Sequence, residues 1–329
     1  MIVLGMDGGA SKTHAVLADE KGAVVGVGRS GCSNWEVVGL EGAREALHQA
    51  VREALAQAGL SPGHVVASAY GLAGFDWPSD EGRLMPLIAS LGLSGPVNLV
   101  NDAFLPLRAG TRDGVGIAAI AGSGTGVAGC NRSGQTARSF GAGYPFTDWG
   151  GAGEIVREAF YRVAARYKCL GPETALAQAL VEALDCGTVD ALMEGVMRWR
   201  LKLGGHLAPL VFEVAHQGDA VARDVIARAG RTIGANVVAV AKRLGMLGEP
   251  FDLVTAGGVF SSRSPVLNEA LLCAVQAHAS SVSLVHWEAR PVVGAVLLAA
   301  DLLHLASPPE PAAVAEQVMC ALAALEEEG

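Results

Sequence analysis

The segment 7–13, which reads DGGASKT, has the residue types of a phosphate-binding turn. Its glycines let backbone N–H groups approach an anion, its hydroxyls add donors, and Asp7 can hold a magnesium ion through water. The segment is not a P-loop, because Met6 and Ser11 stand where that motif has glycine and a strand follows instead of a helix. A plain hairpin turn is the alternative interpretation of this segment. The residues that would surround phosphates are Gly8, Gly9, Ser11, Lys12 and Thr13.

Two further glycine-rich turns occur later in the chain, at 122–126 (GSGTG) and at 257–258 (GG). The second follows the apolar run 251–256, and open α/β sheets place ligands at the carboxyl ends of strands. The turns at 7–13 and 122–126, each opening one of two duplicated domains, could together clamp the phosphates of one nucleotide. The candidate residues in these two later turns are Gly122, Ser123, Gly124, Thr125, Gly257 and Gly258.

Asp102 follows the apolar run 97–101 and precedes a helix-like segment at 103–108. An aspartate in this position can simply cap the helix. Phosphoryl transfer, however, needs positioning, a metal ion and a base for the acceptor hydroxyl. Its place at a strand end makes Asp102 the candidate for that general base.

The elements that would position these residues repeat one plan. Apolar runs at 2–6, 13–18 and 23–27 are separated by a small-residue turn and a polar turn, and the runs 115–121, 127–130 and 135–140 follow the same order. Two copies of strand, small-residue turn, strand, polar turn and strand indicate an internal duplication, with one copy opening each domain.

Strands and helices alternate after the first copy. A helix is expected at 41–60, a strand at 65–70, a helix at 84–91 and a strand at 97–100. Residues 154–247 are helical in pattern with one interruption at 203–205, which makes them a helical insert. A strand at 251–256, a helix at 265–279, a strand at 282–285, a helix at 291–305 and a final short helix after 307 complete the prediction. This alternation implies sheets with parallel strands and helical cover.

Composition limits the class of function. The 329 residues are 51% hydrophobic and carry a net charge of −9, which suits a globular protein of about two domains. The acidic balance argues against nucleic acid and favours a small-molecule partner. We expect no signal peptide, no membrane span and a cytoplasmic location. The six cysteines form no C-x-x-C pair, which argues against a zinc site and a disulfide framework.

Taken together, the motifs of this sequence resemble those of a known protein superfamily. DGGASKT, AGSGTG and TAGGVF resemble, in order, the phosphate-1, phosphate-2 and adenosine motifs of the actin-like ATPase superfamily of sugar kinases, Hsp70 and actin. The segments SNW at 33–35, GLAG at 71–74, VNDA at 100–103 and AHQGD at 215–219 are similar to the N-acetylglucosamine kinase group of the BadF/BadG/BcrA/BcrD ATPase family. The resemblance covers residues 1 to about 305.

The resemblance implies an α/β fold of two duplicated ribonuclease-H-like domains around an ATP cleft, with a helical insert in the second. Residues 1–114 and about 290–329 would form the N-terminal domain, with the sugar side and the catalytic aspartate. Residues 115–289 would form the C-terminal, nucleotide-side domain. The implied activity is ATP-dependent transfer of a γ-phosphate to a hydroxyl of an amino sugar such as N-acetylglucosamine or glucosamine, with ATP and Mg²⁺ as cofactors.

The resemblance also assigns roles by position. Asp7 would hold Mg²⁺, and Asp102 would deprotonate the sugar hydroxyl. The glycine-rich turns named above would bind the phosphates and adenosine. The remaining implied contacts are Asn34, Trp35, Gly143 and Asp148 for the sugar, together with Asp102, and Ala215 near the adenine.

One segment departs from the family pattern G-G-W-G-x-x-x-G-D-E-G-S. In residues 140–151, Ala142 stands in place of the tryptophan and Trp149 in place of the glutamate, whereas Asp148 is kept. Loss of one aromatic wall and gain of another should reshape the sugar pocket. Trp149 can equally be an ordinary packing residue.

Two other functions stay open. The family includes ATPases that activate acyl-CoA reductases or dehydratases through an iron–sulfur cluster shared between two subunits; residues 140–153, where one ligand cysteine would be expected, contain none. A non-catalytic ATP-binding regulator is favoured if Asp102 is only a helix cap. A homodimer is the partner expectation that we retain, although the sequence does not define the oligomeric state.

Overall fold

The chain forms two compact units in a computed structural model that describes residues 1–279 and 281–327. Unit 1 comprises Met1–Gly116 and Trp287–Gly329, and unit 2 comprises Ile117–His286. The sequence places the corresponding boundaries at 114/115 and about 289/290. Each unit has its own sheet and its own hydrophobic core.

Unit 1 is built on a five-stranded sheet of order β3-β2-β1-β4-β5. The strands β1, β2 and β3 are antiparallel neighbours, whereas β4 and β5 run parallel to β1. These strands are β1 (Ile2–Gly8), β2 (Thr13–Asp19), β3 (Val24–Ser30), β4 (Val65–Leu72) and β5 (Val97–Val100).

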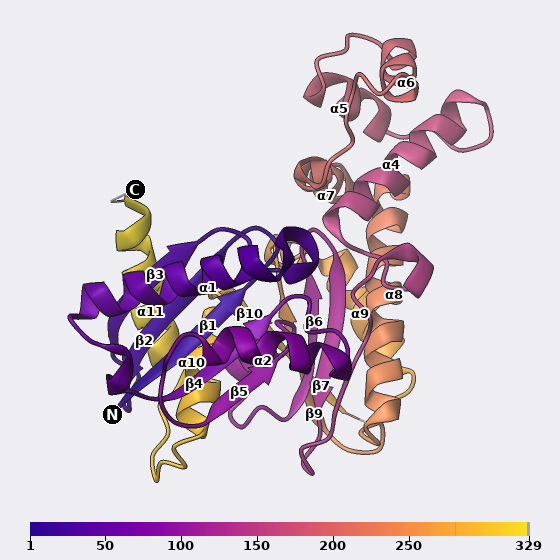
Figure 1. Ribbon diagram of the computed structural model, residues 1–329. Helices are drawn as coiled ribbons and strands as arrows, with labels where there is room; N and C mark the ends of the chain where they lie inside the picture. The colour runs from indigo at the N-terminus through magenta and orange to yellow at the C-terminus, as the bar shows by residue number, and fades with distance from the viewer. Residues whose placement is uncertain (280, 328–329) are drawn as a thin grey trace. The chain divides into compact units, whose positions relative to one another are not determined.

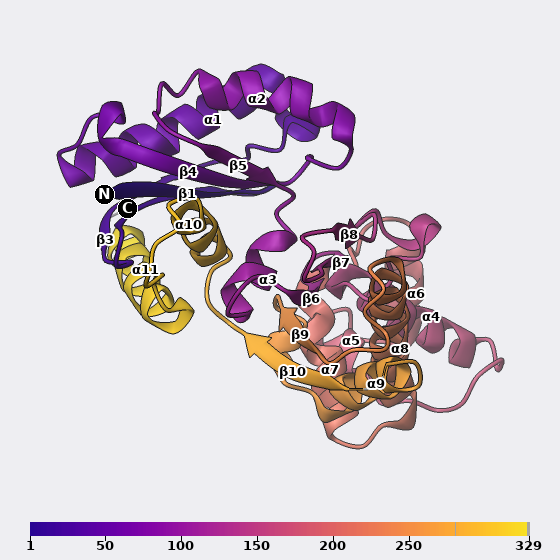
Figure 2. The same cartoon turned by 90° about the horizontal axis from the view of Figure 1, so that it is seen from below.

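Helices cover both faces of this sheet, with α1 and α2 on one side and α10 and α11 on the other (Figure 2). Because side chains alternate along a strand, Leu4 and Met6 of β1 enter the core under α1, while Val3 enters the core under α10. The helices of unit 1 are α1 (Trp35–Ala58), α2 (Glu81–Ala89), α3 (Phe104–Gly110), α10 (Val292–Asp301) and α11 (Pro311–Glu327), with 3-10 turns at Pro62–His64 and Pro78–Asp80.

Close packing of α10 on β1 depends on Gly5. A Cβ atom at this position would lie 2.3 Å from Val296 N, which is far inside van der Waals contact. Asp7 lies two residues further along the same strand and therefore on the same face. The glycine thus allows α10 to pack beside the strand end that carries Asp7.

Unit 2 repeats this plan, with a sheet of order β8-β7-β6-β9-β10. The strands β7 and β8 are antiparallel, and β6 and β9 are parallel. The repeated strand order confirms the predicted α/β fold of two duplicated domains. The strands are β6 (Gly116–Ala121), β7 (Thr125–Cys130), β8 (Thr136–Arg138), β9 (Phe251–Ala256) and β10 (Val282–Trp287).

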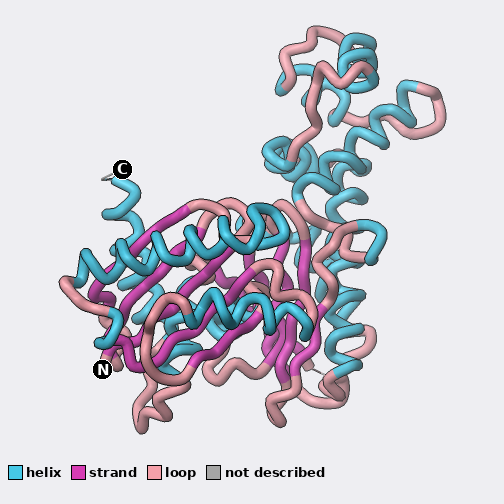
Figure 3. Tube along the Cα trace, viewed as in Figure 1, coloured by secondary structure: helices cyan, strands magenta, loops and turns pink. Residues whose placement is uncertain are grey.

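The helical insert lies between β8 and β9, and Figure 1 shows α5 and α6 at the far end of α4 from the strands of unit 2. Figure 3 shows the loops that separate these helices. The sequence predicted one interruption of this region, but the structure has several. The helices of unit 2 are α4 (Ala152–Tyr167), α5 (Leu176–Ala183), α6 (Val189–Met197), α7 (Ala208–His216), α8 (Ala220–Arg243) and α9 (Pro265–Gln276), with 3-10 turns at Tyr144–Phe146, Gly205–Leu207 and Phe260–Ser262.

Two expected elements differ in extent. The first helix begins at Trp35, earlier than the predicted 41, because residues 35–38 form a turn that a break at Gly39 (φ 73°) separates from the regular helix. The third strand of the second copy is only Thr136–Arg138, since residues beyond it enter a loop. Across residues 1–279 and 281–327, no helix has the length and apolarity that a membrane crossing requires.

Candidate functional site

The carboxyl ends of three parallel strands meet at one edge of the sheet in unit 1. Asp7 in β1 is in register with Gly71 in β4, and Gly71 is in register with Val100 in β5. Asp102 lies two residues after Val100. Gly71 has no side chain, and Leu105 of α3 fills the space that a Cβ there would need. The missing side chain therefore lets α3 pack on the sheet, with Asp102 directly before it.

The carboxyl of Asp7 is held in an unusual electrostatic environment. Its pKa is raised from 3.8 to about 7, mainly by burial and next by the charge of Asp102. The cations Lys12 and Arg290 act in the opposite sense but do not compensate. Two carboxyls this close favour either a shared proton or a bound cation.

A magnesium ion fits this pair of carboxyls. Mg²⁺ in nucleotide sites is commonly bound by one or two carboxylates together with waters and substrate phosphates, not by a full protein cage. The described part of the chain contains no cluster of three or more His, Cys, Asp or Glu side chains suited to a metal.

Asn101 organises the turn that carries Asp102. Its Oδ1 accepts a hydrogen bond from Ala103 N (3.1 Å), and its Nδ2 donates to Asp76 Oδ1 (3.0 Å). The N-cap residue of α3 is Ala103, one residue after Asp102. The turn is therefore fastened by the asparagine, and Asp102 does not occupy the cap position that its alternative interpretation requires.

The 7–13 turn closes with a hydrogen bond from Gly9 N to Lys12 O (3.0 Å). Ser11 and Lys12 are exposed, as a phosphate contact requires. Thr13 differs, because it is fully buried and its Oγ1 lies 2.8 Å from both Gly31 O and Ser33 Oγ. The hydroxyl of Thr13 is thus engaged inside the protein, and we correct its expected role from phosphate contact to support of the turn.

Asn34 is bonded to its own helix, and Trp35 is bonded to the segment after β4. Asn34 Oδ1 accepts from Glu36 N (2.9 Å) and caps α1. Trp35 Nε1 donates to Gly74 O (2.7 Å), and the guanidinium of Arg83 lies 5.3 Å from its ring centroid. The indole N–H is therefore used within the protein, so any sugar contact of Trp35 would come from its ring.

His14 and Arg290 also lie near Asp7, and no motif in the sequence marks either of them. His14 is opposite Asp7 in the β1–β2 register and fully buried, and its Nδ1 has no hydrogen-bond partner among the described residues. Burial and the charges of Lys12 and Arg290 lower the pKa of His14 to about 4. Arg290 Nη2 donates to Glu326 Oε1 of α11 (3.0 Å).

In unit 2, two of the glycine-rich turns follow adjacent strands. The parallel strands β6 and β9 end at Ala121 and Ala256, and Ile120 is in register with Ala256. The backbone joins them, because Val259 N donates to Ala121 O (2.9 Å). Gly257 has φ 95° and would place a Cβ 2.5 Å from Ala121 O, so only glycine fits there. The turns at 122–126 and 257–258 are therefore neighbours.

The N-terminus of α4 packs against the 122–126 turn. Ala152 N donates to Gly122 O (2.8 Å), and a Cβ on Gly151 would lie 2.6 Å from Ser123 O. Glu154 Oε2 accepts from the N–H groups of residues 150 and 151. Exposed Ser123 and Gly124 thus lie beside the first turn of a sixteen-residue helix, whose N–H groups at 150–152 are already bonded to Glu154 and Gly122.

The loop 139–151, between β8 and α4, contains the substrate residues expected from the resemblance. Asp148 is 1% exposed, and its Oδ2 accepts from Ala142 N (3.1 Å). Its backbone N donates to Gly143 O (3.2 Å), and its O accepts from Thr125 Oγ1 (2.8 Å). Asp148 therefore holds the loop together through its carboxylate and backbone, and Gly143 is partly exposed.

Trp149 is a packing residue. It is 8% exposed and belongs to the hydrophobic core of unit 2, with the guanidinium of Arg228 4.6 Å from its ring centroid. Trp149 therefore does not supply a new aromatic wall. The exposed aromatic side chains of this loop are Phe140, Tyr144 and Phe146.

Ala215 lies near the end of α7, is 3% exposed and belongs to the same core. Its side chain cannot contact adenine without a change in this packing. The following residues 217 and 218 are exposed. Ala215 is thus a buried position directly before an exposed segment, and its place near the adenine stays a prediction.

The two units share one strand order, and each carries small-residue turns at the carboxyl edge of its sheet. Two ribonuclease-H-like units of this kind in one chain define the actin-like ATPase fold. Residues 4–299 match the model of the BadF/BadG/BcrA/BcrD ATPase family. The chain belongs to that family.

Known proteins resemble the chain over most of its length. The N-acetyl-D-glucosamine kinase of Dictyostelium discoideum is 28% identical over 313 residues, which cover 91% of this chain and 97% of that protein. The N-acetylmuramic acid/N-acetylglucosamine kinase of Clostridium acetobutylicum is 29% identical over 269 residues, covering 81% and 88%.

The fold is also similar to that of a solved sugar kinase. The ROK family glucokinase of Streptomyces griseus, solved in complex with glucose and AMPPNP, superposes with a TM-score of 0.57. It is 21% identical, with 92% of this chain and 99% of that chain covered. This likeness supports the fold, but a shared fold does not define the substrate.

Proposed function

We propose that the protein is an ATP-dependent kinase that transfers the γ-phosphate of Mg-ATP to a hydroxyl of an amino sugar, with N-acetylglucosamine as the leading candidate. The observation that carries the proposal is the pair Asp7 and Asp102. The raised pKa of Asp7 and its interaction with the charge of Asp102 favour a divalent cation there, and a metal bound to phosphate would supply one.

In this proposal, Asp102 is the general base. It accepts the proton of the sugar hydroxyl as the oxygen attacks the γ-phosphate, the bond to the β-phosphate oxygen breaks, and ADP leaves. The turn fastened by Asn101 holds Asp102 in place. Magnesium, when bound at Asp7, would offset charge that develops on the phosphates. The neutral imidazole of His14, opposite Asp7, adds no competing charge.

Each unit has its own set of groups that we propose as phosphate contacts. In unit 1 we propose the exposed Ser11 and Lys12 as donors, while Gly8 and Gly9 would let the phosphate approach the backbone closely. In unit 2 the proposed donors are Ser123 and Gly124, which lie beside the first turn of α4. The exposed Gly258, joined to the same edge, would lie along the adenosine.

The amino sugar is favoured by the relatives. Both curated relatives carry N-acetylglucosamine in their names and match more than four-fifths of this chain. We propose Asn34 and the ring of Trp35 in unit 1, and Gly143 with the backbone held by Asp148 in unit 2, as the sugar contacts. The domain roles follow: unit 1 carries the catalytic aspartate, and unit 2 carries most nucleotide contacts.

The proposal is tested by measuring ADP release over a panel of sugars. N-Acetylglucosamine, glucosamine, N-acetylmuramic acid, N-acetylmannosamine and glucose are each supplied with Mg-ATP, and the sugar phosphate is identified by mass. We expect sugar-dependent ADP release for an amino sugar. ADP release that no sugar stimulates, or an iron–sulfur chromophore in anaerobically purified protein, contradicts a sugar kinase.

A further inference from the structure

The exposed part of the loop 139–151 is built largely from turns. Four of its residues have positive φ, namely Gly141, Gly143, Thr147 and Gly150. Its side chains at 140, 144 and 146 are exposed, and the rings of Phe140 and Phe146 lie against each other with their centroids 5.4 Å apart. The conformation of such a loop is determined by the few points at which it is fastened to the rest of unit 2.

Trp149 is the main buried side chain at the end of this loop. Arg228 of α8 covers its ring at 4.6 Å, and the same guanidinium donates to Glu158 of α4 at 2.7 Å. A cation held over an indole face is attracted by the ring's quadrupole, and the attraction grows as water is excluded. Trp149 is 8% exposed, which satisfies that condition on the ring side.

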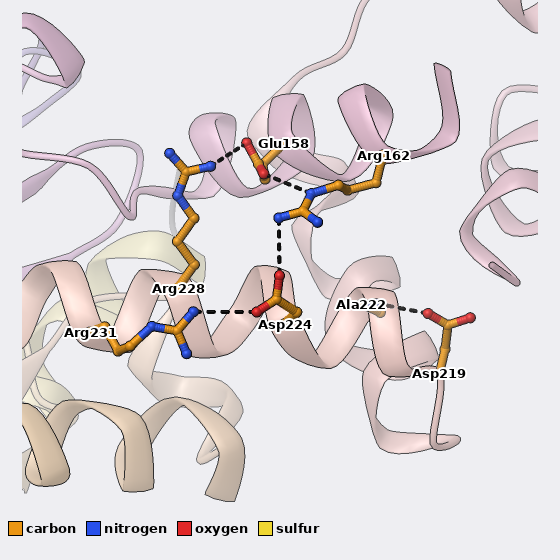
Figure 4. A network of polar contacts seen from close by, with 7 residues as sticks. All are labelled: Glu158, Arg162, Asp219, Ala222, Asp224, Arg228 and Arg231. Atoms are coloured by element: carbon orange, nitrogen blue, oxygen red, sulfur yellow. Dashed lines mark hydrogen bonds and ion pairs between the residues drawn. The ribbon is translucent and has the colours of Figure 1, made fainter. Parts of the chain in front are cut away.

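Arg228 is itself held in place by an ion-pair network that joins α4 to α8 (Figure 4). Glu158, whose side chain is 12% exposed, pairs with Arg228 and also with Arg162 (2.9 Å). Arg162 in turn pairs with Asp224 (3.0 Å), and Asp224 with Arg231 (3.3 Å). The cation over Trp149 is therefore pre-positioned by two helices.

The restraint on Trp149 extends to the exposed part of the loop through Asp148. Asp148 immediately precedes Trp149, and its carboxylate and backbone bond to Ala142 and Gly143. A second fastening comes from α8, where Asn236 Nδ2 donates to Thr147 O (2.9 Å). A shift of the indole would therefore move the residues that face the solvent side of the loop.

We propose that the Arg228–Trp149 stack, fixed by Glu158, is a positioning device that sets the geometry of the 139–151 loop and thereby the enzyme's affinity for its acceptor sugar. Arg228 and Trp149 do not touch the reacting atoms. The inference rests on the proposed sugar kinase function. It assigns a role to the tryptophan at 149, and it predicts that acceptor binding depends on a cation in α8.

The test compares Arg228→Met with Arg231→Met. Each variant removes one cation of the same network from α8, but only Arg228 stacks on Trp149. Glu158 keeps Arg162 as a partner in the first variant, and Asp224 keeps Arg162 in the second. The two variants are therefore matched in charge lost and in the ion pair that remains.

For Arg228→Met we expect the KM of the acceptor sugar to rise about tenfold, while the KM of ATP stays within about twofold. Backbone amides of residues 139–148 should exchange hydrogen faster in this variant. Arg231→Met should match the wild type in all three, and Arg228→Lys should lie between. Equal effects of the two methionine variants, or a parallel rise in both KM values, would overturn the inference.

Hydrogen exchange separates this inference from the proposed function. If the wild type phosphorylates no sugar, the sugar kinase proposal fails, and with it the affinity effect assigned to the stack. Unchanged loop exchange in Arg228→Met, in an enzyme that does phosphorylate a sugar, overturns the positioning device alone.

Discussion

Replacement of Asp7 by asparagine should stabilise the protein without nucleotide and impair the binding of Mg-ATP. The folded protein raises the pKa of this carboxyl to about 7 through burial and the charge of Asp102. The unfolded chain ionises it near 3.8. Ionisation of Asp7 therefore costs the folded state more than the unfolded chain, and stability is lost as the pH rises from about 3.8 to about 7.

The size of this cost follows from the displacement of the pKa. A difference from 3.8 to about 7, at about 1.4 kcal/mol for each pH unit, gives an upper limit of about 4 kcal/mol. Asp7 is partly accessible, and water and local relaxation lower the figure, so we expect about 2 kcal/mol at pH 8. That corresponds to a rise in Tm of about 4–8 °C for a domain of this size.

The assay is thermal or urea unfolding of the wild type and Asp7→Asn at pH 5 and pH 8, without magnesium and nucleotide. The gain of the variant should be largest at pH 8 and less than half as large at pH 5, where the wild-type carboxyl is still protonated. Asp102→Asn should give a smaller gain, because it removes only the charge that acts on Asp7. A variant that is destabilised, or whose gain does not depend on pH, would refute this electrostatic reasoning.

Two further predictions concern the nucleotide. Arg290→Gln removes a cation near the carboxyl pair and should weaken Mg-ATP binding, measured by calorimetry, about three- to tenfold. Its control, Glu326→Gln, should leave the affinity within about twofold of the wild type. Equal effects of the two variants would mean that the ion pair only holds α11. Gly151→Ala should weaken binding of an ATP analogue by at least about tenfold, because the new Cβ would lie 2.6 Å from Ser123 O. Gly153→Ala is its control, since the nearest atom there is 3.5 Å away and belongs to a flexible arginine; similar losses in both would contradict the packing argument.

Much of the fold could be predicted because the pattern is local. Apolar runs of strand length, separated by glycine-rich and polar turns, occur twice in one order, and the two sheets have the same strand order. The breaks within the helical region could not be read in the same way. An apolar stripe at helical spacing continues across residues that tertiary packing turns into loops, such as the turn after Tyr167 with Cys169 at φ 58°.

The proximity of Asp7 and Asp102 could also be predicted from the sequence. Asp7 and Asp102 each stand at the end of an apolar run, and the carboxyl ends of parallel strands meet at one edge, so their proximity follows from the topology. Arg290 is nearly three hundred residues from Asp7 and is brought there only by the packing of α10 on β1. No local pattern marks such a residue.

The burial of individual side chains is a second feature of the site that could not be predicted from the sequence. Thr13 and Trp149 have residue types suited to ligand contact. In the structure, however, the hydroxyl of Thr13 supports a turn, and the ring of Trp149 packs against the guanidinium of Arg228. Strand alternation places Thr13 on the inward face, but the partner that occupies its hydroxyl comes from residues 31–33. Burial of Trp149 depends on α8, some eighty residues further along the chain.

The central claim is that Asp102 serves as the base in phosphoryl transfer to a sugar. Its most direct test is a single-turnover measurement of sugar phosphate formed by the wild type and by Asp102→Asn at saturating Mg-ATP and acceptor, with the Kd of an ATP analogue measured for both. We predict that Asp102→Asn lowers the transfer rate by about 10²–10⁴ and leaves the Kd within about threefold. A transfer rate within about threefold of the wild type, or a rate loss matched by an equal loss of nucleotide affinity, would contradict the account.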